Sequence, residues 1–186
     1  SQIIWKSGAH TLVTSCPICY KVFKESYYLD VEVLHHSQFI KNCIDEGLVK
    51  MNFLHKRVTY HTPCELGRNS GVYDEPREVL RHVANLESTG FDDEKSLCCG
   101  GSLGNIMLSQ EKKRRKAADT AGELTKKHPD YLITACPLCK KTLAPVTRSK
   151  VIDLSEIVAE AIVTPAVLKK NPERFKKPVR ESAGIE

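Results

Sequence analysis

Residues 132–139, LITACPLC, are the most informative stretch of this sequence, because a short apolar and β-branched run passes directly into a Cys-Pro-x-Cys motif. Runs of this kind are typical of buried strands in parallel sheets. Binding sites of such sheets lie in the loops at the carboxyl ends of the strands. The stretch therefore predicts a strand that ends at a functional loop.

The same pattern occurs earlier in the chain, as LVTSCPIC at residues 12–19, an offset of 120 residues. The same offset aligns residues 31–34 with residues 151–154. Each copy is expected to contain a strand, a Cys-Pro-x-Cys loop, a helix, a second strand and a second helix. Cysteines 64, 98 and 99 belong to the second copy and have no counterpart in the first. We therefore expect the C-terminal part of a first repeat at 1–50, a complete second repeat at 51–163, and a basic, proline-containing tail at 164–186.

Strands and helices are expected to alternate along the chain. Strands are predicted at residues 11–15, 30–34, 57–61, 131–135 and 150–152, and helices at 37–48, 74–86, 108–127 and from 153 onward. The last helix begins with Asp153-Leu154-Ser155-Glu156, the pattern of a capping box. This alternation predicts an α/β fold with mostly parallel sheets flanked by helices.

Composition excludes several classes of protein. With 186 residues, 41% of them hydrophobic and 27% charged, the chain has the composition of a globular domain. No apolar run reaches the length of a membrane span, and the first residues do not form a signal peptide, so we expect a cytoplasmic protein or a fragment of one. The basic run at 112–116 spreads around a helix without a nucleic-acid-binding motif. It predicts a solvated helix, suited to docking an acidic electron-transfer partner, and no nucleic-acid partner.

The cysteines are clustered rather than scattered. They are Cys16, Cys19, Cys43, Cys64, Cys98, Cys99, Cys136 and Cys139. Secreted disulfide-stabilised domains are usually shorter chains with a higher density of cysteine. In a reducing compartment, clustered cysteines indicate metal ligands or redox thiols. The proline in each Cys-Pro-x-Cys stiffens the turn from which two thiolates can bind one metal centre.

Five of these cysteines, with a pair of glycines, form one spaced set in the second repeat. The set is Cys64, then Cys98-Cys99-Gly100-Gly101, then Cys136 and Cys139. Soft thiolates select iron-sulfur clusters, copper(I) or zinc. Five thiolates are one more than an ordinary zinc site uses, and adjacent ligands suit a centre with several metal atoms. These residues favour an iron-sulfur site and leave zinc, or thiols without metal, as alternatives.

The set resembles the cysteine-rich CCG domain of the heterodisulfide reductase family of iron-sulfur proteins. That family includes the iron-sulfur subunits of glycolate oxidase, anaerobic glycerol-3-phosphate dehydrogenase and lactate-utilisation complexes. The stretches YHTPCELGR at 60–68 and VYDEPREVL at 72–80 look like the family's blocks around its first cysteine. The resemblance extends over residues 5–163 and does not include a ferredoxin-type cysteine run.

The resemblance implies a non-cubane [4Fe-4S] cluster held by Cys64, Cys98, Cys99, Cys136 and Cys139. The backbone at Gly100 and Gly101 would approach it closely. It also implies an oxidoreductase module that transfers electrons, to a disulfide or towards a quinone, within a heterodisulfide reductase-like or flavin-linked complex. Its partner would be a flavoprotein or a ferredoxin-like protein. The alternative is a zinc-binding structural or interaction module on the same scaffold.

The remaining candidates carry weaker signals. Cys16 and Cys19 match only the end of the first repeat's motif and predict an incomplete second metal site. Cys43 is expected in the core, and His35-His36 at the start of a helix. For His61, a structural hydrogen bond is favoured over contact with a cluster thiolate. Arg68 and Arg77 are expected either to balance cluster charge or to pair with Asp74 and Glu75.

Overall fold

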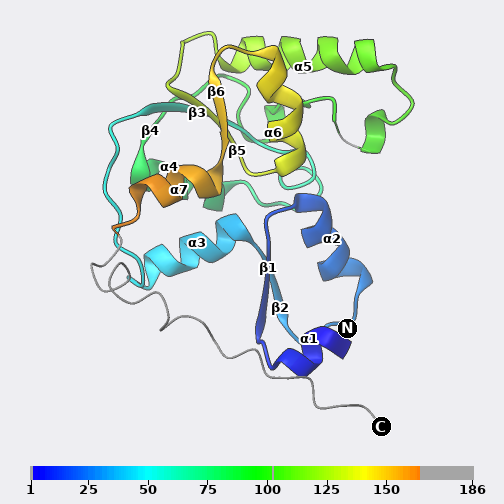
Figure 1. The fold of residues 1–186 in the computed structure, drawn as a ribbon, viewed down its shortest axis with the longest axis vertical. Coiled ribbons are helices and arrows are strands. Elements are labelled where there is room, and N and C mark those ends of the chain that lie inside the picture. The colour runs from blue at the N-terminus through cyan, green and yellow to red at the C-terminus, as the bar shows by residue number, and fades with distance from the viewer. Residues whose placement is uncertain (1, 102, 164–186) are drawn as a thin grey trace.

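The computed structural model describes residues 2–101 and 103–163, which form two parallel sheets flanked by helices (Figure 1). The predicted α/β class is confirmed, and the predicted tail at 164–186 lies outside the described residues. The elements in chain order are α1 (Gln2–Ser7), β1 (Thr11–Thr14), α2 (Pro17–Ser26), β2 (Glu32–His35), α3 (His36–Asp45), β3 (Arg57–His61), α4 (Asp74–Val83), β4 (Asn85–Leu86), η1 (Asp93–Lys95), η2 (Leu103–Asn105), α5 (Gln110–Leu124), β5 (Tyr131–Thr134), α6 (Pro137–Leu143), η3 (Ala144–Val146), β6 (Lys150–Asp153) and α7 (Leu154–Ala161).

The larger sheet has the strand order β4-β3-β5-β6, and the smaller sheet pairs β1 with β2. All of these pairs are parallel, so the carboxyl ends of β3, β5 and β6 lie at one edge. The stretch quoted first forms β5 and the loop after it, and Leu132 and Ile133 are fully buried. A strand with sheet neighbours on both sides and helices on both faces explains that continuous apolar run.

The segments β1-α2-β2-α3 and β5-α6-β6-α7 have the same order of elements. Thr14 pairs with His35, and Thr134 pairs with Asp153. The first strands are therefore 120 residues apart, but the second strands are 118 apart, because α2 has 10 residues whereas α6 has 7. The alignment of residues 31–34 with 151–154 was wrong by two residues. In the corrected alignment His35 and Asp153 are equivalent, and each is the N-cap of a helix with a capping box.

Two predicted helices end early for identifiable reasons. The helix predicted at 74–86 ends at Val83, because Asn85 and Leu86 pair with β3 as a short edge strand. The helix predicted at 37–48 ends at Asp45, just before Gly47, whose φ of +66° is a conformation that stops a helix. Strand pairing ends the first helix and a glycine turn ends the second, although the apolar periodicity continues past both ends.

The main core joins the two sheets. Tyr60 from β3, Leu80 from α4 and Ile157 from α7 are fully buried in it. Tyr20 from α2 is only 1% exposed and belongs to the same cluster. The helices of both halves therefore pack on one shared apolar interior. Among the described helices, none is both long enough and apolar enough to cross a bilayer.

The capping box at the start of α7 gives a first testable prediction. The Asp153 carboxylate accepts a hydrogen bond from the Ser155 amide at 2.9 Å, and the Glu156 carboxylate accepts one from the Asp153 amide at 2.7 Å. We expect Asp153→Ala to lower the free energy of unfolding by about 1 kcal/mol, because the first-turn amides lose their acceptor. Urea denaturation measures the change. The control is Asp119→Ala, an exposed site within α5; equal stabilities for the two variants would contradict the prediction.

Candidate metal centre

The five thiols of the predicted set meet at the carboxyl edge of the larger sheet. His61, the last residue of β3, pairs with Thr134, the last residue of β5. Cys64 and Cys136 follow these two strand ends within three residues, so they leave the sheet side by side. Cys139 lies in the first turn of α6, which begins at the proline of the second Cys-Pro-x-Cys motif.

The loop that carries Cys98 and Cys99 is fixed by hydrogen bonds from side chains around it. The Ser96 hydroxyl donates to the Thr62 carbonyl at 2.7 Å, and the Arg68 guanidinium donates to the Ser96 carbonyl at 2.6 Å. The Thr120 hydroxyl, from α5, donates to the Cys98 carbonyl at 2.9 Å. The loop is therefore tied both to the end of β3 and to α5.

His61 holds the same loop from the end of β3. The pKa of His61 is lowered to about 4 by burial, so the ring is neutral at physiological pH. Its Nε2 lies 3.0 Å from the Leu97 carbonyl, which can only accept, so the proton sits on Nε2. Its Nδ1 then accepts from the Thr134 hydroxyl at 3.3 Å. The structural hydrogen bond predicted for His61 is confirmed.

The five thiols form a continuous chain of contacts. Hydrogen bonds between side chains link Cys64 to Cys98, Cys98 to Cys99, and Cys136 to Cys139. The Sγ atoms of Cys99 and Cys139 are 3.4 Å apart and close the chain. Cys99, Cys136 and Cys139 are buried, whereas Cys64 and Cys98 are half-buried. All eight cysteines of the sequence are described, and none forms a disulfide.

The pKa values of the thiols differ because in each hydrogen bond one thiol is the donor and the other the acceptor. Hydrogen bonds from Cys64 and Cys99 lower the pKa of Cys98, while the hydrogen bond to Cys98 raises the pKa of Cys64. A hydrogen bond from Cys139 lowers the pKa of Cys136 to about 7, and the pKa of Cys139 is raised by the same bond. In each hydrogen-bonded pair the loss of one proton is thus favoured, which gives a thiolate, the form that binds metal.

Backbone and amide donors surround the most acidic thiol. The Gly100 amide donates to Cys98 Sγ and the Gly101 amide donates to Cys99 Sγ, each at 3.4 Å. The Asn105 side-chain amide also donates to Cys98 Sγ at 3.4 Å. The N–H groups of the two glycines are thus directed at cysteine sulfur, and their close approach to a cluster remains a prediction. Donors of this kind stabilise the negative charge of thiolates that are bound to metal.

A small cavity lies among the thiols. It is lined by Cys64, Cys99, Cys136 and Cys139 together with the apolar side chains of Ile18 and Leu138. Its free volume is about 10 Å³. Within residues 2–101 and 103–163, no three His, Cys, Asp or Glu side chains surround a single-ion position. The donor set, five thiols with amide donors, has the chemistry of an iron-sulfur site.

The first Cys-Pro-x-Cys motif contributes an apolar side chain to this cavity. Ile18 and Leu138 occupy equivalent positions in the two motifs, and both line the cavity. Cys16 and Cys19, which flank Ile18, do not line it. Their side chains are hydrogen-bonded to each other, which raises the pKa of Cys19. They are thus separate from the five-thiol chain, and their predicted role as a second metal site remains a prediction.

The other candidates are resolved by their surroundings. Cys43 is half-buried rather than in the core, because α3 places it near the exposed end of the helix. His36 lies 3.4 Å from the Asp153 carboxylate, and His35 caps α3, as the position at a helix start predicted. The pairing of arginines with Asp74 and Glu75 was wrong. Arg77 pairs with Asp92 and Asp93, and Arg68 donates to the Ser96 carbonyl.

Several residues around the thiols carried no recognisable signal in the sequence. They are Ile18, Ser96, Asn105 and Thr120. Each acts through a contact between residues far apart in the chain, or through a single amide in an irregular loop. For Ile18 alone, the repeat gave an indication. Ile18 and Leu138 are the third residues of the two Cys-Pro-x-Cys motifs, and both line the cavity among the thiols.

Gly101 is predicted to tolerate no side chain. A Cβ atom there would lie 2.5 Å from Thr142 Oγ1 and 3.4 Å from Leu138 Cγ. We expect Gly101→Ala to lower the free energy of unfolding by about 1 to 2 kcal/mol through overpacking. The double variant Gly101→Ala, Thr142→Ala is expected to recover most of this loss, and a double-mutant cycle of denaturation midpoints measures the recovery. An additive double variant would show that the contact with Thr142 is not the cause.

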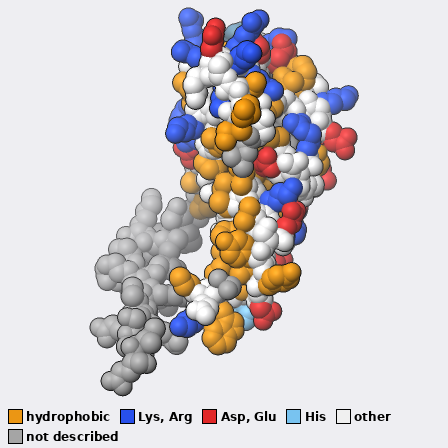
Figure 2. Space-filling model, turned by 90° about the vertical axis from the view of Figure 1, so that its right-hand side faces the viewer, with side chains coloured by type: hydrophobic (Ala, Val, Ile, Leu, Met, Phe, Trp, Pro, Cys, Tyr) orange, Lys and Arg blue, Asp and Glu red, His pale blue; other side chains and the backbone are white. Residues whose placement is uncertain are grey.

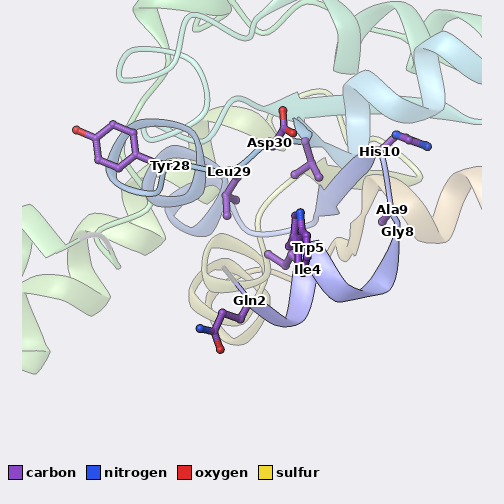
Figure 3. Close-up of a pocket in the computed structure, with 10 residues that line it drawn as sticks. Gln2, Ile4, Trp5, Gly8, Ala9, His10, Tyr28, Leu29 and Asp30 are labelled. Carbon is purple, nitrogen blue, oxygen red and sulfur yellow. The ribbon is translucent and has the colours of Figure 1, made fainter. Parts of the chain in front are cut away.

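A separate hollow, of about 410 Å³, lies beside the smaller sheet (Figure 3). It is formed by α1 and the connection before β2, with Trp5, His10, Tyr28 and Asp30 among its lining residues. No cysteine lines it. It is therefore unrelated to the thiol chain, although its volume is much greater than that of the space among the thiols.

Comparison with known proteins finds one matching family and several curated relatives. Residues 58–144 match the cysteine-rich domain, CCG. One subunit of the dihydromethanophenazine:CoB–CoM heterodisulfide reductase of Methanosarcina barkeri is 30% identical over 181 residues, covering 87% of this chain and 43% of the relative. The probable iron-sulfur-binding oxidoreductase FadF of Bacillus subtilis is 26% identical, covering 85% of this chain and 24% of the relative. One subunit of the fumarate reductase (CoM/CoB) of Methanothermobacter marburgensis is 34% identical, covering 72% and 27%. The chain spans less than half the length of each of these relatives.

Proposed function

This chain belongs to the cysteine-rich CCG family through residues 58–144, and we propose that it is an iron-sulfur module that transfers electrons within a larger oxidoreductase. The relatives support this proposal, because their names describe an iron-sulfur-binding oxidoreductase and subunits of two reductases. A further relative, from Syntrophomonas wolfei, is an EtfAB:quinone oxidoreductase and is 29% identical over 177 residues.

The observation that carries the proposal is the continuous chain of five thiols. Its members come from two strand ends, one loop and one helix turn, yet every one of them contacts another. Hydrophobic packing alone does not gather five cysteines at a sheet edge where binding sites form. We propose that Cys64, Cys98, Cys99, Cys136 and Cys139 hold a non-cubane [4Fe-4S] cluster, which would supply one-electron steps.

The surrounding residues have definite tasks in this proposal. The Gly100 and Gly101 amides and the Asn105 amide donate to sulfur and so stabilise its negative charge. Ile18 and Leu138 cover the thiols with apolar side chains and keep water from the cavity. His61 and Thr120 hold the Cys98-Cys99 loop in place through its carbonyl groups. These residues position the thiols and are not themselves reactive.

The partner in this proposal is another redox subunit, a flavoprotein or a ferredoxin-like protein. Two of the relatives are named as subunits of reductases, and a third as an EtfAB:quinone oxidoreductase. We propose a disulfide or a quinone pathway as the final electron acceptor. The partner and the electron acceptor are proposed in addition to the cluster. Their tests follow the detection of iron in the protein.

Metal and sulfide analysis of the full chain, purified without oxygen, tests the proposal. We expect about four irons and a matching amount of acid-labile sulfide per chain, with absorption in the visible range that bleaches on reduction. About one zinc per chain with no iron, persisting after an attempted cluster reconstitution, would contradict the electron-transfer role. That result would favour a structural zinc module on the same scaffold.

A further inference from the structure

Another cavity, of about 440 Å³, lies on the other side of the Gly100-Gly101 backbone from the thiols. One wall is the face of α5 that carries Gln110, Lys113, Arg114 and Ala117, residues spaced as neighbours on one side of a helix. The facing wall is α6, and Val146 closes the far end. The volume is within the range of small-molecule pockets.

The lining of this cavity has an unusual balance of charge. It contains three cationic side chains, Lys113, Arg114 and Lys141, and no carboxylate. In the described part of the chain, none of the three forms an ion pair, whereas Lys140, next to Lys141, pairs with Glu156. Figure 2 shows several Lys and Arg side chains, with Asp and Glu side chains among them, at the end of the molecule that carries α5 and α6. Three cations around one cavity whose lining holds no carboxylate raise the local concentration of anions.

The rest of the lining is apolar. Ala117, Leu138, Pro145 and Val146 contribute hydrocarbon surface between the cations. A free inorganic anion would leave this surface in contact with water, whereas an anion attached to a short hydrocarbon body covers it. The lining therefore matches an organic anion better than a simple ion.

The cavity is a neighbour of the thiol site. Leu138 lines both spaces. The amides of Gly100 and Gly101, which form the floor, donate to cysteine sulfur. A ligand in the cavity would therefore contact residues that themselves contact the thiols.

We propose that the cavity between α5 and α6 binds a small organic anion, a carboxylate or phosphate with an apolar body, through Lys113, Arg114 and Lys141. This site needs no metal, so it stands or falls independently of the iron-sulfur proposal. Its position beside the thiols makes it the place where a substrate or an effector of the redox site would be held.

Titration calorimetry on the full chain at low ionic strength tests the proposal with three probes. Hexanoate carries both the charge and the hydrocarbon body, hexanol carries the body alone, and inorganic phosphate carries the charge alone. We expect saturable binding of one hexanoate per chain and no detectable binding of hexanol. Phosphate that binds as tightly as hexanoate would overturn the assignment to an organic anion, and so would the absence of binding by all three.

Matched variants locate the site. We expect Lys113→Gln and Lys141→Gln each to weaken hexanoate binding about tenfold, because each removes one charge-assisted contact. Lys112→Gln and Arg115→Gln lie in the same basic run but outside the cavity and are the controls. Equal losses in the control variants would attribute binding to the general positive field and overturn the proposal. Val146→Phe, which keeps every charge, is expected to block the cavity and reduce binding at least tenfold; unchanged affinity would also overturn it.

Discussion

Replacing both Cys98 and Cys99 with serine is expected to remove all bound iron from the protein. The pair contributes two of the five thiols and takes part in all three of the contacts that join Cys64 to Cys139. Serine has a similar shape but presents a hard oxygen in place of a soft thiolate, which iron-sulfur clusters require. Only the Cys136–Cys139 pair remains linked, because Cys64 loses its connection to it through Cys98 and Cys99.

The measurement is iron and acid-labile sulfide per chain, with a thiol titration of the unfolded protein as a second readout. The control is Cys43→Ser, which changes a half-buried thiol on α3 outside the five-thiol chain. It is expected to keep the full iron content. If the double variant retains as much iron per chain as the Cys43→Ser control, Cys98 and Cys99 are not ligands and the proposed ligand set is incorrect.

The sequence predicted the parts of the site that depend on local pattern. The two Cys-Pro-x-Cys loops follow strands as expected, and Cys64 follows the strand at residues 57–61, whose bounds were predicted correctly. Parallel strands that end at one edge bring such loops together, so the meeting of Cys64 with Cys136 follows from the fold class. The glycines after Cys99 carry their own signal, because only glycine permits close approach of a backbone.

The remaining features depend on contacts that no local pattern encodes. The short strand at Asn85 and Leu86 exists because β3 offers it a free edge, not because two residues have a strand propensity. The anchoring of the Cys98 loop by Thr120 joins residues 22 positions apart through one hydroxyl. One of the two alternatives for Arg77 paired it with nearby acids in the sequence, but the chain folds the loop at residues 92 and 93 onto it instead.

Arg77→Leu is expected to lower the free energy of unfolding by about 2 to 3 kcal/mol. The guanidinium is only 5% exposed, lies 3.2 Å from an Asp92 carboxylate oxygen and 2.6 Å from one of Asp93, and covers the ring of Tyr60. The short contact with Asp93 is an ion pair without hydrogen-bond alignment. Breaking a buried pair usually costs about 3 to 5 kcal/mol, and the partial exposure of both carboxylates places this one at or below the lower end of that range.

The effect of this substitution depends on pH, and its sign is fixed by Asp92. Burial alone would raise the pKa of Asp92, but the Ser88 hydroxyl and the Arg77 guanidinium together lower it. A carboxyl with a lowered pKa in the folded state contributes stability above the pKa of the unfolded chain, about 3.9, and loses it as the pH falls. We therefore expect the difference between the wild type and Arg77→Leu to be full at pH 7 and to shrink below about pH 4.

Urea denaturation at pH 7 and at pH 3 measures both parts of this prediction. Arg81→Leu, which changes an exposed residue one turn further along α4, is the matched control and is expected to change stability by less than about 0.5 kcal/mol. Arg77→Lys is expected to recover only part of the loss, because an ammonium cannot contact two carboxylates in the planar geometry of a guanidinium. A loss independent of pH would show that Arg77 acts through packing on Tyr60 rather than through Asp92. In that case the ion pairs of Arg77 with Asp92 and Asp93 would contribute little to holding the loop before Cys98 against α4. The hydrogen bonds of Ser96 and Arg68 would then be its main attachments.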